Sequence, residues 1–422
     1  MRPRTPGACA ARGGRRSSVA RGWSIDRPVG DAGRVRVGMF SDSYLPRISG
    51  VVRSVAAFVA ELRRQGHTAT VYAPGYPGYA DDDPEVVRFP SVRAPGVPDF
   101  PLAIPFARRF LADLRRRRLD VVHTHSPFLM GAAGRYAARR LGLPLVFTHH
   151  TMYSEYVHYV PLVSHDFSRQ VVTRYTARYC NQCALVIAPS DVVRAHLVAS
   201  GVRAPVEVLP TAGLDLARFE RLDPAWVRPR YGIPAGAPLV ITVGRLAREK
   251  RFDVLLAAFA AAAQGGPARL LVVGGGPQQP ELRALAGELG IAGQVVFSGP
   301  LAHDRVLDCY AAADLFAFAS PTETQGLVVV EAMAAGLAVA AVGAGGVAEA
   351  VRNGETGLLT GPDAARLAEA IRRLIDDADL RRRYAAAGRV AARRYAIDQV
   401  VQRLVALYRY VRTDAPTIAA PE

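Results

Sequence analysis

Several features that would assign the chain to common protein classes are missing. Four cysteines in 422 residues are too few for a disulfide scaffold, so we expect a reducing, cytoplasmic compartment. The apolar run Val254–Ala263 is about half the length that a membrane-crossing helix needs. The arginine-rich start is followed by no apolar segment, which argues against a secretory signal.

Signatures of metal, redox and nucleotide-hydrolysing sites are also weak. There is no GxxxxGK[ST] phosphate loop and no GxSxG elbow, which argues against a P-loop ATPase and an α/β-hydrolase. Cys180 and Cys183 form an isolated CxxC, which we interpret as buried thiols, with a redox role as the alternative. Asp81–Asp83 resembles a metal-binding DxD but lies in a Pro- and Gly-rich loop, which favours a solvated turn. We expect no metal and no cofactor.

Positive charge is abundant: the formal net charge is +16 and the pI is about 10.2. This balance predicts an anionic partner. Residues 1–34, with eight Arg and two Asp, are interpreted as a disordered basic tail. Phe106–Arg118 has the pattern of a basic amphipathic helix that could contact an anionic membrane. A domain helix with a solvated basic face is the alternative, and the lack of aromatic stacking residues argues against nucleic acid.

Short apolar runs alternate with helical patterns along the whole chain. Among these runs, buried strands are predicted over Leu145–Thr148, Leu239–Val243 and Arg269–Val273. The alternating order is typical of an α/β protein with two Rossmann-like, doubly wound parallel-sheet domains facing each other across a cleft. Prolines at positions 210, 224, 229 and 234 mark the boundary. We predict a first domain over residues 35–212 and a second domain over residues 213–395. Residues 396–422 would add a helix, packing back on the first domain, and a short tail.

Polar residues follow the predicted strands at their carboxyl ends, where parallel sheets bind ligands. Two sheets facing each other would direct all of these groups into one crevice. The residues are Gly50, His123, His125, His149, His150, Arg245 and Glu323.

The segment Ser320–Gly336 (SPTETQGLVVVEAMAAG) is the most informative. Glu323 lies in a loop, Gly326 permits a turn, and a helix is predicted over Leu327–Ala335. The free N–H groups at its start form a seat for a diphosphate. Glu331, about one turn inside, is suited to accept hydrogen bonds from ribose hydroxyls, and Glu323 to contact a sugar ring.

This segment resembles the Glu-x7-Glu signature of retaining glycosyltransferases of family four, which have the GT-B architecture. Three further motifs match the same family in the same order: Val243–Lys250 (VGRLAREK), Gly345–Glu349 (GGVAE) and Asn353–Leu359 (NGETGLL). The resemblance covers nearly the whole chain from about residue 35.

The resemblance implies roles for individual residues. Arg245 and Lys250 would clamp the diphosphate without an obligatory metal, and His150 would lie near the donor sugar and the acceptor. Glu323, with His150, Arg245 and Lys250, completes the predicted catalytic set. The predicted donor-binding residues also include Gly50, Gly274, Thr324, Gln325, Gly326, Leu327 and Glu331.

Three runs resemble the bacterial 1,2-diacylglycerol 3-alpha-glucosyltransferases more closely: His123–Gly131, His149–Pro161 and Thr322–Gly326. This implies a UDP-glucose donor, a membrane-lipid acceptor and peripheral association with the inner face of the membrane. His123, His125 and His158 would lie on the acceptor side. Thr211–Asp215 departs from the family pattern by one residue.

Two alternatives stay open from the sequence. One is a GDP-mannose-dependent α-mannosyltransferase acting on a phosphatidylinositol-type or other acceptor. The other is a sugar-nucleotide epimerase or a non-catalytic protein that binds sugar nucleotides.

Overall fold

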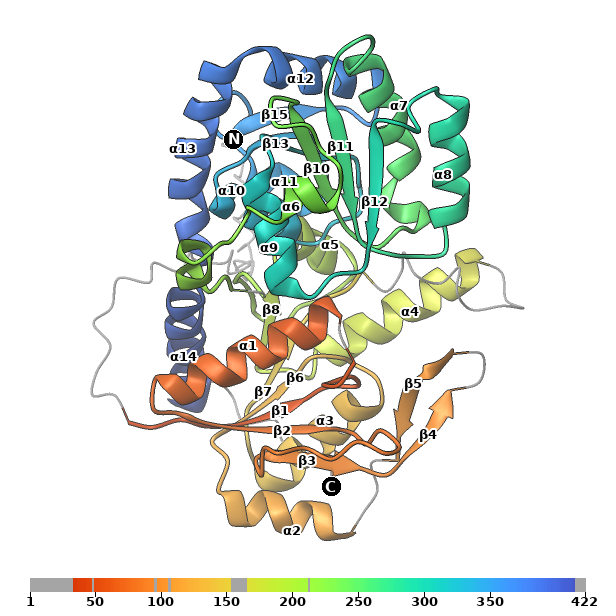
Figure 1. Cartoon of the computed structure of the whole chain (residues 1–422). Helices are drawn as coiled ribbons and strands as arrows, with labels where there is room; N and C mark the ends of the chain where they lie inside the picture. Colours follow the sequence, from red (N-terminus) through yellow and green to blue (C-terminus); the bar gives the residue numbers. More distant parts are fainter. Residues whose placement is uncertain are drawn as a thin grey trace, which may run out of the picture. The chain divides into compact units, whose positions relative to one another are not determined.

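The computed structural model describes residues 33–47, 49–94, 97–104, 108–152, 165–211 and 213–413. All of the elements named below belong to the unit Arg34–Glu422. Two separate parallel sheets organise this unit (Figure 1). The α/β architecture predicted from the alternating pattern is therefore confirmed.

The first sheet has seven strands in the order β3-β2-β1-β6-β7-β8-β9, all parallel. The order changes direction beside β1, so the loops that leave β1 and β6 open onto a switch point of the kind that binds ligands. The strands are β1 Arg36–Phe40, β2 Thr68–Pro74, β3 Val86–Phe89, β6 Val121–Thr124, β7 Leu145–Thr148, β8 Leu185–Ala188 and β9 Val206–Val208.

Helices accompany this sheet, and a two-stranded antiparallel hairpin follows β3. Helix α1 begins after Ser49, whose hydroxyl accepts from Val52 N, and it is followed by Gly66 with a φ of +84°. The elements are α1 Gly50–Arg64, β4 Ser91–Ala94, β5 Val97–Ala103, α2 Arg108–Arg117, α3 Leu129–Leu141, α4 His165–Cys180 and α5 Asp191–Ala199.

The second sheet has six parallel strands in the order β12-β11-β10-β13-β14-β15. Its switch point lies between β10 and β13. The strands are β10 Leu239–Val243, β11 Arg269–Val273, β12 Val295–Gly299, β13 Leu315–Phe318, β14 Ala338–Val342 and β15 Gly357–Thr360. The accompanying helices are α6 Val227–Arg230, α7 Phe252–Ala262, α8 Gln279–Glu288, α9 His303–Ala312, α10 Leu327–Ala335, α11 Gly345–Ala350 and α12 Ala364–Asp376.

After the second sheet the chain returns to the first. Helix α13, Ala378–Ala392, is followed by α14, Ile397–Thr413, whose apolar face joins the core beneath the seven-stranded sheet. Leu214 lies where the chain passes from the first sheet to the second. Its N–H donates to Tyr395 O, in the segment between α13 and α14, at 2.7 Å. Gly213 lies so close that a Cβ there would be 2.6 Å from Ile397 Cα.

Helix α2 contains most of the predicted basic amphipathic segment, and its apolar side faces inward. Phe110 is 7% exposed and Leu114 is fully buried. The Phe110 ring lies edge-on to Phe40, Tyr72 and Phe89. The side chains expected to enter a membrane therefore pack in the core, while Phe106 lies outside the described residues. No helix in the described part of the chain is long and apolar enough to cross a bilayer.

Candidate functional site

The loop before α10 has a geometry that glycine makes possible. Gly326 caps α10 with a φ of +72°, and Gly336 ends the helix with a φ of +87°. Gly345 and Gly346 pack against this loop: Gly346 N donates to Glu323 O at 2.8 Å, and a Cβ on Gly345 would lie 2.3 Å from the same oxygen. The loop that carries Glu323 is therefore held in place by backbone contacts with the start of α11.

Lys250 and Glu323 meet at the carboxyl edge of the second sheet. The distance from Lys250 Nζ to Glu323 Oε1 is 2.5 Å, and both side chains are 17% exposed. Lys250 lies in a short 3-10 helix, Arg248–Lys250, after β10, and Arg245 is exposed in the same connection. Two predicted catalytic residues, 73 positions apart, are thus in direct contact.

Gly274 and Gly276, in the loop after β11, pack against the backbone of the connection that contains Arg245. Gly274 has a φ of +134°, and a Cβ there would lie 2.0 Å from Gly244 O. A Cβ on Gly276 would lie 2.3 Å from Leu246 O. The glycines therefore let the loop after β11 press against the backbone on either side of Arg245.

Glu331 of α10 is buried in the second half of the chain, the part that contains the six-stranded sheet. Only 1% of its surface is exposed. Arg53 of α1 donates to its Oε1 at 2.6 Å, and the Tyr310 hydroxyl lies 3.3 Å from Oε2. His303 Nε2 is 3.7 Å from Oε1. Burial raises the pKa of Glu331, and Arg53 opposes that shift.

A cluster of histidines occupies the carboxyl edge of the first sheet. His125 Nδ1 lies 2.9 Å from His150 Nε2, and His125 Nε2 lies 3.2 Å from Met39 Sδ. His123 bonds with both ring nitrogens, to the Tyr408 hydroxyl at 2.6 Å and to Thr148 Oγ1 at 2.7 Å. His123 is therefore engaged in holding α14 to β6 and β7 and offers no free nitrogen to an acceptor.

Burial keeps these histidines neutral. It lowers the pKa of His123 and His150 to about 3, that of His149 to about 4, and that of His125 well below its ordinary value, with neighbouring histidines adding to the effect. Neutral imidazoles can donate or accept hydrogen bonds to sugar hydroxyls without attracting a counter-ion.

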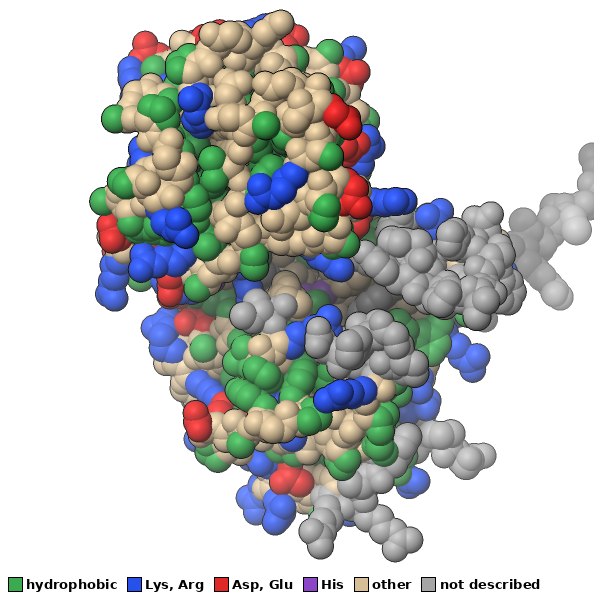
Figure 2. Space-filling model, turned by 45° about the vertical axis from the view of Figure 1, so that its right-hand side comes forward, with side chains coloured by type: hydrophobic (Ala, Val, Ile, Leu, Met, Phe, Trp, Pro, Cys, Tyr) green, Lys and Arg blue, Asp and Glu red, His purple; other side chains and the backbone are tan. Residues whose placement is uncertain are grey.

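Hydrogen bonds connect the residues around the two sheets. Thr324 Oγ1 donates to His150 O at 3.2 Å, and Thr211 N donates to Gln325 Oε1 at 3.0 Å. Glu349 accepts from Asp191 N at 2.8 Å, at the start of α5. The Thr-Glu-Thr-Gln-Gly loop thus contacts the histidine region directly. In Figure 2, a histidine is visible in the hollow between the upper and lower parts.

Of the remaining predicted residues, the structure describes Gly50 and Leu327 but not His158. Gly50 begins α1, and among the described residues no atom beyond its chain neighbours and its own helix backbone lies within 4 Å of a Cβ built there. Leu327, the first residue of α10, is half-buried. His158 lies outside the described residues.

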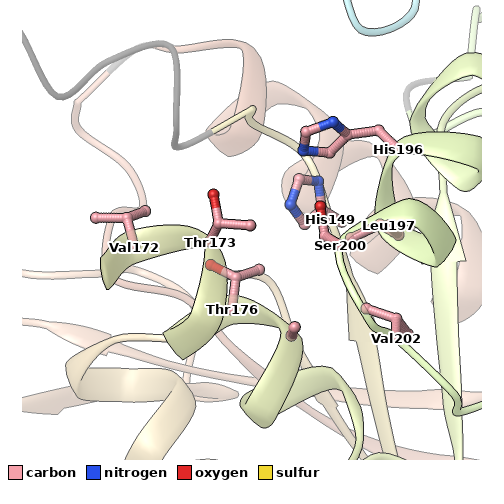
Figure 3. A pocket seen from close by; sticks show the side chains of 9 residues that line it. His149, Val172, Thr173, Thr176, His196, Leu197, Ser200 and Val202 are labelled. Carbon is pink, nitrogen blue, oxygen red and sulfur yellow. The ribbon is translucent and has the colours of Figure 1, made fainter. Parts of the chain in front are cut away.

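A small cavity lies beside the histidines, between α4 and α5 (Figure 3). Its volume is about 10 Å³, room for a water molecule but not for a sugar. His149 and His196 line it together with Thr173, Thr176 and Ser200.

Arg53 was not among the site residues predicted from the sequence. A sign of its importance was available, since Arg53 lies in the first turn of α1, where the helix dipole disfavours a cation. Its partner, 278 positions away, could not be identified from spacing.

Two family models match successive parts of the chain: Glycosyltransferase Family 4 over residues 48–218, and Glycosyl transferases group 1 over residues 227–391. A GDP-mannose-dependent alpha-mannosyltransferase of Mycobacterium tuberculosis is 34% identical over 92% of this chain and 99% of its own. The alpha-monoglucosyldiacylglycerol synthase of Streptococcus pneumoniae is 33% identical over 73% of this chain and 71% of its own. A crystal structure of HepE from Anabaena in complex with UDP and glucose aligns with a TM-score of 0.71 at 23% identity, covering 89% of this chain and 99% of that one.

Proposed function

This chain is a glycosyltransferase of family four with the GT-B fold, and from that premise we propose that it transfers an α-linked hexose from a nucleotide sugar to a membrane lipid. Glucose from UDP-glucose and a diacylglycerol-type acceptor are the proposed substrates. The contact between Lys250 and Glu323, beside the start of α10, carries the proposal.

The donor diphosphate is proposed to bind between Lys250, Arg245 and the N–H groups at Gly326 and Leu327. Fixed cations and helix N–H groups stabilise the charge that develops on a leaving nucleoside diphosphate. Lys250 would exchange its contact with Glu323 for the diphosphate. Glu323 would then be available to orient the hexose hydroxyls, and Gly50 would let the start of α1 approach the phosphates.

The sugar is proposed to lie against His150, with transfer to the same face of the ring. Glu323, the carboxylate nearest to the proposed sugar, is proposed to hydrogen-bond to the hexose hydroxyls rather than to act as a nucleophile. In this scheme a leaving-diphosphate oxygen accepts the proton of the attacking hydroxyl, and Lys250 and Arg245 stabilise the charge on the diphosphate. His150, being neutral, would hydrogen-bond to the sugar.

A second donor is supported by a specific observation. The mannosyltransferase relative matches 92% of this chain, against 73% for the glucosyldiacylglycerol synthase, at nearly equal identity. The runs His149–Pro161 and Thr322–Gly326 instead favour glucose. GDP-mannose is therefore the second candidate donor.

An exposed apolar band on α3 and α4 supports a lipid acceptor. Phe128 and Tyr175 stack with 5.9 Å between ring centroids, and they are 39% and 40% exposed. Leu129, Tyr136 and Val171 are also exposed. The exposed arginines of these helices are Arg140, Arg169, Arg174 and Arg178.

Aromatic, aliphatic and arginine side chains together suit the interface of an anionic membrane. The band begins three residues after His125, so an acceptor held at this membrane surface would lie near the proposed sugar. We therefore propose α3 and α4 as the main peripheral membrane contact, with the exposed arginines at the end of α2 adding only electrostatic attraction.

The test is transfer of radiolabelled hexose into organic-soluble product. The full chain is incubated with UDP-glucose or GDP-mannose and vesicles that contain diacylglycerol or phosphatidylinositol. Product from UDP-glucose and diacylglycerol supports the first proposal, and product from GDP-mannose alone replaces it with the second. An altered nucleotide sugar without any acceptor would indicate an epimerase instead.

A further inference from the structure

Among the described residues, Arg53 of α1 and Glu331 of α10 form the one ion pair that joins these two helices. The guanidinium donates to the Glu331 carboxylate at 2.6 Å. The two ends differ in exposure, since the Arg53 side chain is 37% exposed and the Glu331 side chain only 2%. The pair therefore neutralises a buried carboxylate of the second half with a cation supplied by the first half.

We propose that Arg53 is a positioning residue of the donor site: it holds the Glu331 carboxylate in the charged form and orientation that a ribose diol needs. The proposal rests on the donor site proposed above. It also means that the ribose site is complete only when α1 and α10 lie together, so donor binding and the approach of the two halves are coupled.

The other groups facing Glu331 cannot easily replace Arg53. Tyr310 is neutral, because burial raises its pKa well above the ordinary value. Burial lowers the pKa of His303 to about 3, so this ring is uncharged at neutral pH. Arg218 also stabilises the charged form of Glu331, but its guanidinium forms an ion pair with Asp304.

The Glu331 carboxylate has hydrogen-bond acceptor positions that its contacts within the protein leave unused. Its two oxygens have about four acceptor positions, and the contacts with Arg53 and Tyr310 use two of them. Two ribose hydroxyls could therefore bind while Arg53 stays in place. If Glu331 were protonated, one oxygen would become a donor and the match to a diol would be lost.

The test compares UDP and GDP binding to the full chain by calorimetry between about pH 5.5 and 8.5. We expect Arg53→Met to weaken binding about tenfold at pH 7, and the deficit to shrink as the pH rises and Glu331 regains its charge. Arg53→Lys should restore most of the affinity. In a Glu331→Gln background, Arg53→Met should add little further loss.

Arg64→Met is the matched control, because Arg64 lies on the same helix and pairs with Glu61 at 67% exposure. It should bind like the parent protein. An Arg53→Met deficit that is equal at every pH, or no deficit at all, would overturn the proposal.

A measurement without ligand separates this proposal from that of the donor site. Without Arg53, the pKa of Glu331 rises further above its unfolded value, so the stabilisation of the folded state is lost as the pH rises. The melting temperature of Arg53→Met should therefore fall increasingly below the parent value with rising pH, and Glu331→Gln should remove that trend. If the parent protein binds neither nucleotide, the donor proposal fails, while parallel melting curves would refute the role of Arg53.

Discussion

The two halves of the site are built from different chemistry. The edge of the second sheet presents charged side chains, with Lys250 and Glu323 in contact and Arg245 exposed. The edge of the first sheet presents buried histidines that burial keeps neutral. One edge therefore suits a diphosphate and the other a set of uncharged hydroxyl groups.

In the proposed donor complex, this difference would let a charged leaving group and an uncharged sugar bind side by side. Cations stabilise a diphosphate best when they are fixed in advance. Near the sugar, a charged imidazole would need a counter-ion and a hydration shell, whereas a neutral imidazole needs only hydrogen-bond partners. Substitutions on the charged edge should thus reduce turnover most.

Lys250→Ala should produce the largest effect. Losing a fixed cation at the leaving group should reduce kcat about 100- to 1000-fold, with little change in melting temperature. Glu323→Ala should have a comparable effect on kcat. Steady-state hexose transfer by purified variants measures both, with Arg248→Ala on the same 3-10 helix as the control. Near-normal kcat in either variant would refute the charged edge as the donor site.

On the neutral edge, His150 and His123 should respond in opposite ways. His150→Ala should reduce kcat about 100-fold, since His150 is proposed to contact the sugar, and should destabilise the fold less than His123→Ala, because among the described residues the His150 ring has one hydrogen-bond partner, His125, and the His123 ring has two. His123→Ala should destabilise the fold by about 2–4 kcal/mol, because it leaves the Tyr408 and Thr148 hydroxyls without their partner. Thermal melting and kinetics on both variants compare them. Equal stability loss in the two would contradict the distinction.

Gly50→Ala tests the space between the two edges. In the part of the chain that the structure describes, the added methyl group meets no packed atom within 4 Å, so the fold should be unaffected. A diphosphate close to the start of α1 would meet the methyl group, and we expect the donor KM to rise about tenfold, equivalent to about 1.4 kcal/mol. Gly287→Ala, in α8 with equally open surroundings, is the control for donor KM. An unchanged KM would remove Gly50 from the donor site.

The smallest expected effect is a pH dependence of stability. The folded pKa of the clustered histidines lies below the unfolded value of about 6.5, so the unfolded state binds more protons between these values. Stability should be highest above about pH 6.5 and fall as the pH drops towards 4, with the melting temperature a few degrees lower at pH 5.5. Scanning calorimetry without ligand measures this. A constant melting temperature would mean that the cluster accepts protons without cost.

Much of the fold follows from local patterns in the sequence. The strands Leu145–Thr148, Leu239–Val243 and Arg269–Val273 have the predicted bounds, as does the helix Leu327–Ala335. Each is a short apolar run or a glycine-bounded segment, so its ends are marked locally. Strand β3 and the β4–β5 hairpin were not predicted, because β3 and β4 have only four residues each and β5 contains two prolines, as a loop would.

The site was predictable only in part, because a sequence pattern indicates strand ends but not the partners of side chains. The motifs identified Lys250 and Glu323, which the fold brings together. They did not indicate that His123, on β6, is buried and bonded to Tyr408 of α14. Nor did they indicate that Phe110 faces the core rather than a membrane. These outcomes depend on α14 and on the aromatic cluster, which contact distant parts of the sequence.

The position of α14 also affects how the chain folds during its synthesis on the ribosome. Six buried side chains of this final helix belong to the core of the seven-stranded sheet: Val400, Val401, Leu404, Val405, Tyr408 and Val411. Until they leave the exit tunnel, the nascent N-terminal part has an unfinished interior. The segment encoded in the middle can therefore mature before the segment encoded first, which reverses the usual order of co-translational folding.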